Sequence, residues 1–227
     1  MISFTPQRGI RPGSLNVPRF VTAQTASPVD LPLLDETGRA ALFTDARTAN
    51  TFTGEPVPDE TLRAVWELAQ WPPTAANTQP LRVTYVRSGS GKERLLPLLA
   101  EGNRAKSEAA PVVALLAADL DFHEHTPVTF PVKPGMRESL EEQGRTGREG
   151  MARFNASLQA GYFLLAARAH GLAAGPMAGF DADAVTDEFF PGGQHRVLLV
   201  VNLGHPATDA WHPRLPRLAA DDVLSFA

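Results

Sequence analysis

The sequence contains no cysteine, which excludes disulfides, a catalytic thiolate and zinc sites built on thiolates. It is not basic either, because its formal net charge is −4, and this argues against a general nucleic-acid binder. No apolar run approaches the length of a membrane span, and the first residues lack the apolar core of a secretory signal. We therefore expect a soluble, cytoplasmic protein that binds neither nucleic acid nor membrane.

The sequence also lacks the common motifs for a metal site, a nucleotide site or a catalytic nucleophile. His123-Glu124-His125 lacks the four-residue spacing of a helical zinc signature, so we expect an exposed loop without metal there. The glycines at 144, 147 and 150 form no dinucleotide fingerprint, and the chain has no phosphate-binding P-loop and no nucleophile elbow. We therefore expect that a cofactor carries the chemistry and that protein side chains position it.

The chain is long enough, at 227 residues and 43% hydrophobic, to bury the core of one domain. Residues 1–30 are proline-rich without helical periodicity, and they predict an N-terminal extension that is flexible or packs on a partner. The domain itself is expected over residues 31–227. Within it, residues 119–148 are proline-rich at the start and charged at the end, which indicates a lid-like insertion.

The hydrophobic pattern alternates helices with strands and so predicts an α+β or α/β layered domain. The expected helices are an amphipathic one with Leu33, Leu34, Ala41, Leu42 and Phe43, and others over 58–71, 92–101 and 149–170. The expected strands are 81–87, 111–118 and 197–203. In the long helix the alanines and Gly161 permit close helix approach, which fits either a dimer contact or a helix buried within one chain.

Two groups of polar residues stand out as binding candidates. The Trp71–Pro80 tract ends a helix in a rigid Pro-Pro turn and then presents the side chains of Thr74, Asn77 and Gln79, which suit a planar polar ligand. Elsewhere Arg47 opens an Arg-Thr-Ala-Asn string, and Arg214 and Arg217 flank a proline near the end of the chain. Guanidinium groups bind phosphate bidentately, and a phosphate monoester needs more than one cation.

Four segments together resemble the flavin-dependent nitroreductase family, from about Leu42 to Phe226. Within it they are most similar to the malonic semialdehyde reductase branch of bacterial pyrimidine degradation, which shows the strings ARTxN, PTxAN, GPMxGFD and RLPRL. The segments here are Phe43–Asn50, Trp71–Pro80, Gly171–Asp181 and Arg214–Leu218.

The resemblance implies an α+β layered domain, mainly an antiparallel sheet flanked by helices, in an intertwined homodimer with FMN at the subunit interface. It assigns the phosphate and ribityl chain to Arg47 and Arg217, with Arg214, and the polar edge of the flavin to Thr48 and Asn50. The partner's flavin would meet Pro73, Thr74, Ala75 and Asn77, and the ring would lie near Gly175, Pro176, Ala178 and Gly179.

The implied activity is an FMN-dependent oxidoreductase that passes hydride from NADPH or NADH through flavin N5 to a small substrate by a ping-pong mechanism. No protein side chain is expected as acid or base. The best single substrate is malonic semialdehyde, reduced to 3-hydroxypropionate, whose carboxylate Arg137 or Lys133 could bind, unless these are only solvated charges. The alternatives are a broad nitro or quinone reductase and a non-catalytic flavin-binding protein.

Overall fold

The computed structural model describes residues 30–87 and 89–227, and the extension expected over residues 1–30 lies, apart from Asp30, outside them. Four strands form one sheet in the order β1-β2-β4-β3, and every neighbouring pair is antiparallel. They are β1 (Leu81–Val86), β2 (Val112–Asp119), β3 (Ala173–Met177) and β4 (His195–Gly204). This confirms the α+β class with a mainly antiparallel sheet.

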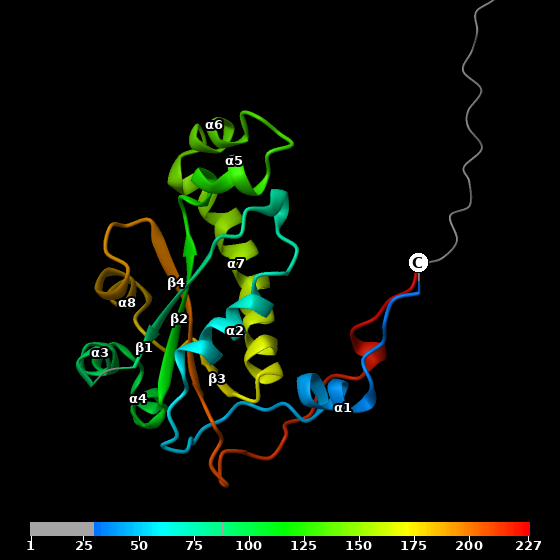
Figure 1. The fold of residues 1–227 in the computed structure, drawn as a ribbon, viewed down its shortest axis with the longest axis vertical. Coiled ribbons are helices and arrows are strands. Elements are labelled where there is room, and N and C mark those ends of the chain that lie inside the picture. The colour runs from blue at the N-terminus through cyan, green and yellow to red at the C-terminus, as the bar shows by residue number, and fades with distance from the viewer. Residues whose placement is uncertain (1–29, 88) are drawn as a thin grey trace, which may run out of the picture. The chain divides into compact units, whose positions relative to one another are not determined.

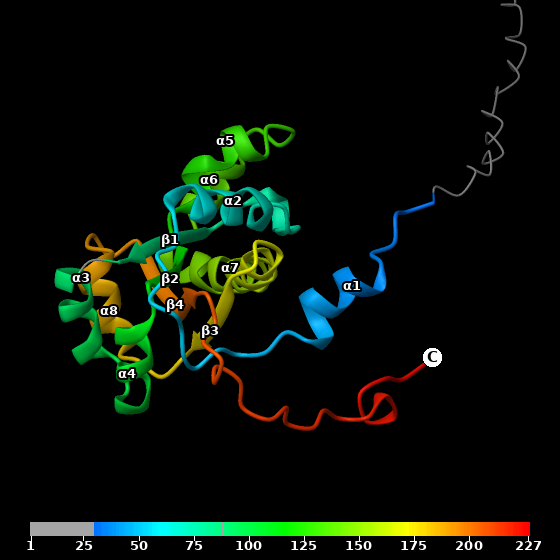
Figure 2. The same ribbon diagram turned by 60° about the horizontal axis from the view of Figure 1, so that its bottom comes forward.

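Helices cover both faces of the sheet, with α2 (Asp59–Ala69) and α7 (Gly144–Ala169) on one face and α3 (Gly89–Leu95), α4 (Glu101–Ala109) and α8 (Ala182–Phe189) on the other (Figures 1 and 2). Residues 119–148, where the sequence predicts a lid-like insertion, contain η4 (Phe122–His125), α5 (Thr126–Thr129) and α6 (Met136–Glu141). The remaining short elements are α1 (Glu36–Arg39), η1 (Ala40–Thr44), η2 (Ala75–Asn77), η3 (Leu96–Leu98) and η5 (Ala220–Asp222).

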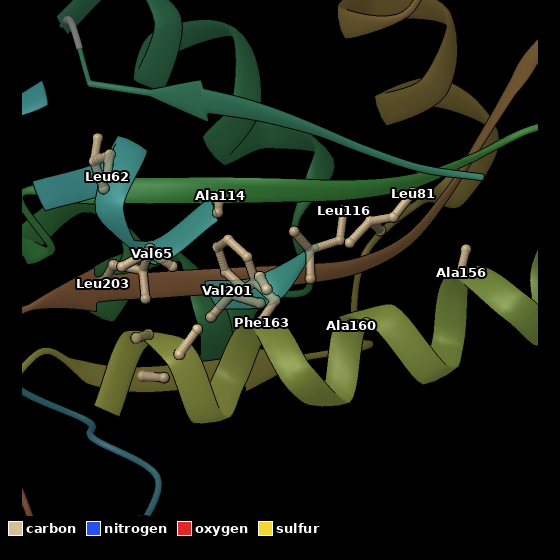
Figure 3. Packing of buried hydrophobic residues seen from close by; sticks show 14 of the residues in the cluster. Leu62, Val65, Leu81, Ala114, Leu116, Ala156, Ala160, Phe163, Val201 and Leu203 are labelled. Carbon is tan, nitrogen blue, oxygen red and sulfur yellow. The ribbon is translucent and has the colours of Figure 1, made fainter. Parts of the chain in front are cut away.

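The central strand β2 is buried along its whole length because both of its faces meet a helical layer. Ala114 and Leu116 point to the core under α2 and α7, whereas Val113 and Leu115 point to the core under α3 and α8. Figure 3 shows Phe163 of α7 packed toward the sheet, with Val65 of α2 above it. A continuous apolar run was therefore the correct signal for this strand.

Several sequence-based boundaries are wrong, each for an identifiable reason. The helix expected at 92–101 begins at Gly89 and ends near Pro97, and a separate helix, α4, follows it. Helix α7 begins at Gly144, five residues before the expected start, despite three glycines in its first turns. It ends as expected, because Gly171 adopts a positive φ of 73° directly after it.

The helix expected around Leu33–Phe43 is shorter than predicted, since Asp35 caps α1 and leaves Leu33 and Leu34 outside it. Its apolar side chains do not form a buried face, because Leu33, Leu34 and Phe43 are all exposed. On α7, Phe154 and Leu158 are likewise exposed, at 66% and 41%, where the sequence pattern suggested a core face. In the described residues no helix is long and apolar enough to cross a bilayer.

Candidate functional site

The Arg47–Asn50 segment packs against the start of β3. The amide of Ala49 donates to the carbonyl of Ala174 at 3.2 Å, and the amide of Asn50 donates to the carbonyl of Ala210 at 3.1 Å. A Cβ on Gly175 would lie 2.7 Å from the carbonyl oxygen of Ala49, so only glycine admits this close approach. The structure thus joins residues 47–50, β3 and the C-terminal segment, three regions that are far apart in the sequence.

Basic side chains gather where these three regions meet. Arg47 donates to the carbonyl of His212 at 3.3 Å, and Arg214 donates to the carbonyls of Thr44 and Ala46 at 2.5 and 3.0 Å. Arg168, in the last turn of α7, joins them and donates to the carbonyl of Leu42 at 3.4 Å. In Figure 2 the two chain segments that carry Thr44 and Arg214 run in the same direction away from β3.

A cavity of about 200 Å³, which we call the arginine pocket, lies beside them. Arg214 does not line it but donates to the carbonyl of Ala46, which does. Arg47 and Arg168 both line it, and its one acidic lining residue, Asp45, makes no ion pair among the described residues. Burial, and secondly the charge of Arg214, lower the pKa of Arg168 from its ordinary value. The other lining residues are Ala41, Ala46, Gly171, Leu172, Ala173, Ala174, Pro206 and Trp211.

Arg217, the other basic residue of the C-terminal segment, is placed differently. Its guanidinium donates to the carbonyls of Leu215 and Pro216 in its own segment, at 3.0 and 3.1 Å. It does not line the arginine pocket. Thr48 is exposed beside Arg47, and the side-chain amide of Asn50 donates back to the carbonyl of Thr48 at 3.3 Å.

The segment after β3 carries the remaining predicted ring contacts. Pro176 lies within β3, which is an edge strand, so its missing N–H disturbs no pairing on the open side. Ala178 and Gly179 follow it and are exposed. The carbonyl of Gly179 accepts from the amide of Ala100 and from the side chain of Asn103, which a Cβ on Gly179 would approach to 2.8 Å. The backbone here is held in place while its outer side stays accessible.

The Trp71–Pro80 tract has an unusual backbone conformation and is hydrogen-bonded to α7. Ala76, Asn77 and Gln79 have positive φ angles of 49°, 50° and 46°, which are rare for residues other than glycine. The buried side chain of Asn155 accepts from the amide of Ala75 at 2.7 Å, and the hydroxyl of Thr74 accepts from the amide of Gln79 at 3.2 Å. Strained backbone that the surroundings fix in this way is a feature of ligand sites.

A hydrogen bond from Asn77 joins the Trp71–Pro80 tract to residues 119–148. Its side-chain amide donates to the carbonyl of Thr129 at 2.7 Å, and its side-chain oxygen accepts from Gln79 at 2.9 Å. Pro73 and Ala75 beside it are exposed. Among the described residues no hydrogen bond or ion pair joins the tract to the arginine pocket. Asn155 and Arg168 are separated along α7 by about 20 Å, so the two groups lie at different ends of the helix.

The insertion contains a balanced network of charges. Arg148 is buried and bonds to Asp121 and Glu141, and Arg145 pairs with Asp121. Arg137 donates to both carboxylate oxygens of Glu124 at 2.8 Å, so its charge is already paired. Lys133 is exposed, and its ammonium group has no partner within the described part of the chain.

His123 corrects the expectation of an exposed loop at His123-Glu124-His125. Its ring is buried, with Nε2 bonded to Glu141 and 3.5 Å from Glu124, because the segment turns inward as the helix η4. The three side chains lie close enough to share a cation. However, Glu124 is paired with Arg137 and Glu141 with Arg148, so these carboxylates already have cationic partners.

A second cavity, of about 740 Å³, contains none of the predicted site residues. It lies between α2 and β1 and is lined by Leu62, Trp66 and Tyr85 among others. Burial raises the pKa of Tyr85 to about 12, so its hydroxyl stays protonated at neutral pH. The charged residues that line this cavity include Arg82 and Arg87, which are already paired with Asp119 and Asp59. We therefore take the arginine pocket and the Trp71–Pro80 tract as the candidate site.

Comparison with known proteins identifies the family of this chain. The sequence profile of the nitroreductase family matches residues 44–205. The chain belongs to the nitroreductase family. A Streptomyces coelicolor protein with the provisional name NADH dehydrogenase/NAD(P)H nitroreductase is 57% identical over 197 residues, which cover 87% of this chain and 97% of that protein. A Leptothrix cholodnii protein with the same provisional name is 50% identical over 85% of this chain and 97% of its own length.

Solved structures of nitroreductases share the fold. A Bacillus subtilis nitroreductase, itself provisionally named, superposes with a TM-score of 0.73 at 25% identity and covers 84% of this chain and 99% of its own. One from Exiguobacterium sibiricum, solved in complex with FMN, superposes with a TM-score of 0.72 at 20% identity, covering 88% of this chain and all of its own.

Sequence reasoning missed Arg168, Asn155 and Gln159. Arg168 belongs to no motif, because it follows an alanine-rich stretch and looks like an ordinary charge at the end of a helix. Asn155 and Gln159 are fully buried, and Gln159 accepts from the amide of Leu81 at 2.9 Å. Their signal was present, since both lie on the same helical face as Ala152, Ala156 and Phe163.

Proposed function

We propose that this protein is an FMN-dependent oxidoreductase that takes reducing equivalents from NADPH or NADH and passes them to a small organic substrate. The observation that carries the proposal is the arginine pocket, where cationic side chains from three segments meet without a carboxylate partner among the described residues. Such a donor set fits a phosphate monoester. FMN, when bound, would supply the hydride-carrying chemistry that no side chain of the pocket offers.

The protein's own residues would bind and orient the flavin. Arg47 and Arg214 would hold its phosphate, with Arg217 turning from its own segment toward the ribityl chain, while Thr48 and Asn50 would contact polar atoms of the cofactor. Gly175, Pro176, Ala178 and Gly179 would supply the backbone surface against which a flat ring can rest. The exposed sides of Ala178 and Gly179 leave room for this contact.

We further propose a homodimer in which Pro73, Thr74, Ala75 and Asn77 contact the partner's flavin. Two features support it: the tract lies at the other end of α7 from the arginine pocket, and α7 exposes an apolar row. Phe154, Leu158 and Tyr162 repeat every four residues along that row and are 66%, 41% and 43% exposed. The C-terminal segment adds the exposed residues Leu215, Leu218, Leu224 and Phe226.

The dimer is tested by sedimentation of the full-length protein. We expect a single species of twice the chain mass, and Phe154→Glu should shift it toward the monomer, since a charge would then face an apolar surface. Arg153→Glu, one residue along the same helix, controls for added charge. A wild-type monomer at micromolar concentration would contradict the shared site.

For the substrate we propose malonic semialdehyde, reduced to 3-hydroxypropionate, on the strength of the motif strings that resemble that branch of the family. Lys133 is the better candidate for the substrate carboxylate, because Arg137 is paired with Glu124. One binding slot used first by the nicotinamide and then by the substrate gives ping-pong kinetics.

Anaerobic reduction followed by reoxidation tests the activity. The flavin-loaded protein should lose its yellow colour with NADPH or NADH and regain it faster with malonic semialdehyde than with nitrofurazone or a quinone. Faster reoxidation by the nitro compound would favour a broad nitro or quinone reductase, in line with the relatives' names. A yellow protein that neither nucleotide bleaches would be a flavin-binding protein without this activity.

A further inference from the structure

Arg168 stands in a position that its local role does not explain. It occupies the last turn of α7, is only partly exposed and lines the arginine pocket beside Arg47. Among residues 30–87 and 89–227 its guanidinium makes one hydrogen bond, to the carbonyl of Leu42, which is long at 3.4 Å, and its other N–H donors have no partner there. A cation at the end of a helix is favourable, but that does not require the side chain to turn into a pocket beside other cations.

The neighbours of Arg168 increase the positive charge around it. Arg214 lies close enough to lower the pKa of Arg168, after the larger effect of burial. Arg214 also bonds to the carbonyl of Ala46, which lines the same pocket. Asp45 is the one acidic residue that lines this pocket, and it forms no ion pair with these arginines in the part of the chain that the structure describes. Like charges held together in a partly buried place are unfavourable until an anion neutralises them.

Arg104 shows how an ordinary arginine without a carboxylate partner differs from the group around the arginine pocket. Arg104 also donates only to backbone carbonyls, those of Leu99 and Pro97. Unlike Arg168, however, it is exposed and does not line the arginine pocket. An unpaired arginine is therefore not a site by itself. What points to an anionic ligand is that Arg47 and Arg168 line one cavity, while Arg214 bonds to its lining residue Ala46 and lies close to Arg168.

We propose that Arg168 is a further cation of the flavin site, which binds the phosphate of FMN together with Arg47 and Arg214. This inference rests on the proposed function, because it takes the ligand of the arginine pocket to be FMN. Its consequence is selectivity: Arg168 distinguishes FMN, which has the phosphate, from riboflavin, which has the same ring and ribityl chain without it.

The test compares both flavins on the full-length protein freed of bound flavin, with affinities measured by quenching of flavin fluorescence. Arg168→Gln keeps an unbranched polar side chain of similar helix propensity and removes its charge. We expect it to weaken FMN binding about tenfold or more, because a charge-assisted contact to phosphate is lost, and to change riboflavin binding less than about twofold. Arg168→Lys should recover part of the FMN affinity, since it restores the charge without the planar fork.

Arg104→Gln is the matched control, because it removes an arginine that also bonds only to backbone carbonyls and should leave both affinities unchanged. Equal weakening of FMN and riboflavin in Arg168→Gln, or unchanged FMN binding, would overturn the role of Arg168 while leaving the proposed function standing. A wild-type protein that binds neither flavin would overturn both.

Discussion

Arginines in two regions of this molecule are used in opposite ways. Within residues 119–148, Arg137, Arg145 and Arg148 each bond to a carboxylate of the same segment. Around the arginine pocket, Arg47, Arg168 and Arg214 bond only to backbone carbonyls. A paired arginine therefore contributes to the structure of its own segment, whereas a group of arginines without carboxylate partners beside a cavity indicates a site for an anion.

The largest effect should come from the insertion. Arg148 is 3% exposed, donates to the carbonyls of Leu120 and Leu140, and bridges Asp121 and Glu141. Arg148→Met should reduce the free energy of unfolding by about 3 kcal/mol or more, because it leaves carboxylates and carbonyls without their partner. Urea denaturation measures this. Arg145→Met, which removes a more exposed pair, should cost less than about 1 kcal/mol, and equal costs would contradict the distinction.

The arginine pocket should show the reverse pattern. Arg47→Ala should weaken FMN binding by about 1.5–3 kcal/mol, since one charge-assisted phosphate contact is lost, with little change in the free energy of unfolding of the flavin-free protein. Fluorescence titration and denaturation of the same preparation measure both quantities. Unchanged FMN affinity would remove Arg47 from the site, and a large loss of stability would make it a structural residue like Arg148.

Gly175 tests whether the backbone of the site, and not only its charge, is needed. Gly175→Ala would place a Cβ 2.7 Å from the carbonyl oxygen of Ala49, which must move, and we expect a loss of about 1–3 kcal/mol of stability. Unlike Arg47→Ala, it should weaken FMN and riboflavin alike, because the whole Arg47–Asn50 segment shifts. Gly102→Ala, where the added Cβ meets nothing within 4 Å, is the control, and an equally small effect at Gly175 would contradict the close approach.

The smallest expected effect is on the stability of the fold at acidic pH. The hydrogen bond from Arg145, and then that from Arg148, lower the pKa of Asp121 against the opposing effect of burial. Since the folded pKa lies below the unfolded one, ionised Asp121 stabilises the fold above its ordinary pKa of 3.8. This contribution is lost as the pH falls through the folded value. Asp121→Asn should therefore flatten the decline in stability between about pH 5 and about pH 3, by less than about 1 kcal/mol. An unchanged pH profile in urea denaturation would mean that other groups cause the decline.

The sequence predicted those parts of the fold that depend on local pattern. The buried run of β2, the Pro58 start of α2, the Asp181 cap of α8 and the Gly171 end of α7 were all readable from it. Strand β3 was not recognised as a strand, because its Gly-Pro composition is poor in strand-forming residues and only pairing with β4 makes it one. The exposure of Phe154 and Leu158 could not be predicted for a similar reason, since periodicity finds an apolar face without saying what covers it.

The candidate site also contains residues that could be selected from the sequence and residues that could not. Arg47, Arg214 and the Trp71–Pro80 tract could be selected from residue type and motif, and their roles stay predictions that the experiments above address. Arg168 could not be selected, because what distinguishes it is proximity to Arg47 and Arg214 across more than a hundred residues in one direction and over forty in the other. The positive φ angles at Ala76, Asn77 and Gln79 were equally invisible, since tertiary hydrogen bonds impose them.

The central claim is that the arginine pocket binds the phosphate of FMN. The most direct test is the ratio of the affinities of the wild-type protein for FMN and for riboflavin at low ionic strength. The three unpaired guanidinium groups predict that FMN binds at least about a hundredfold more tightly than riboflavin. Equal affinity for the two flavins would show that the pocket does not recognise the phosphate and would contradict the account.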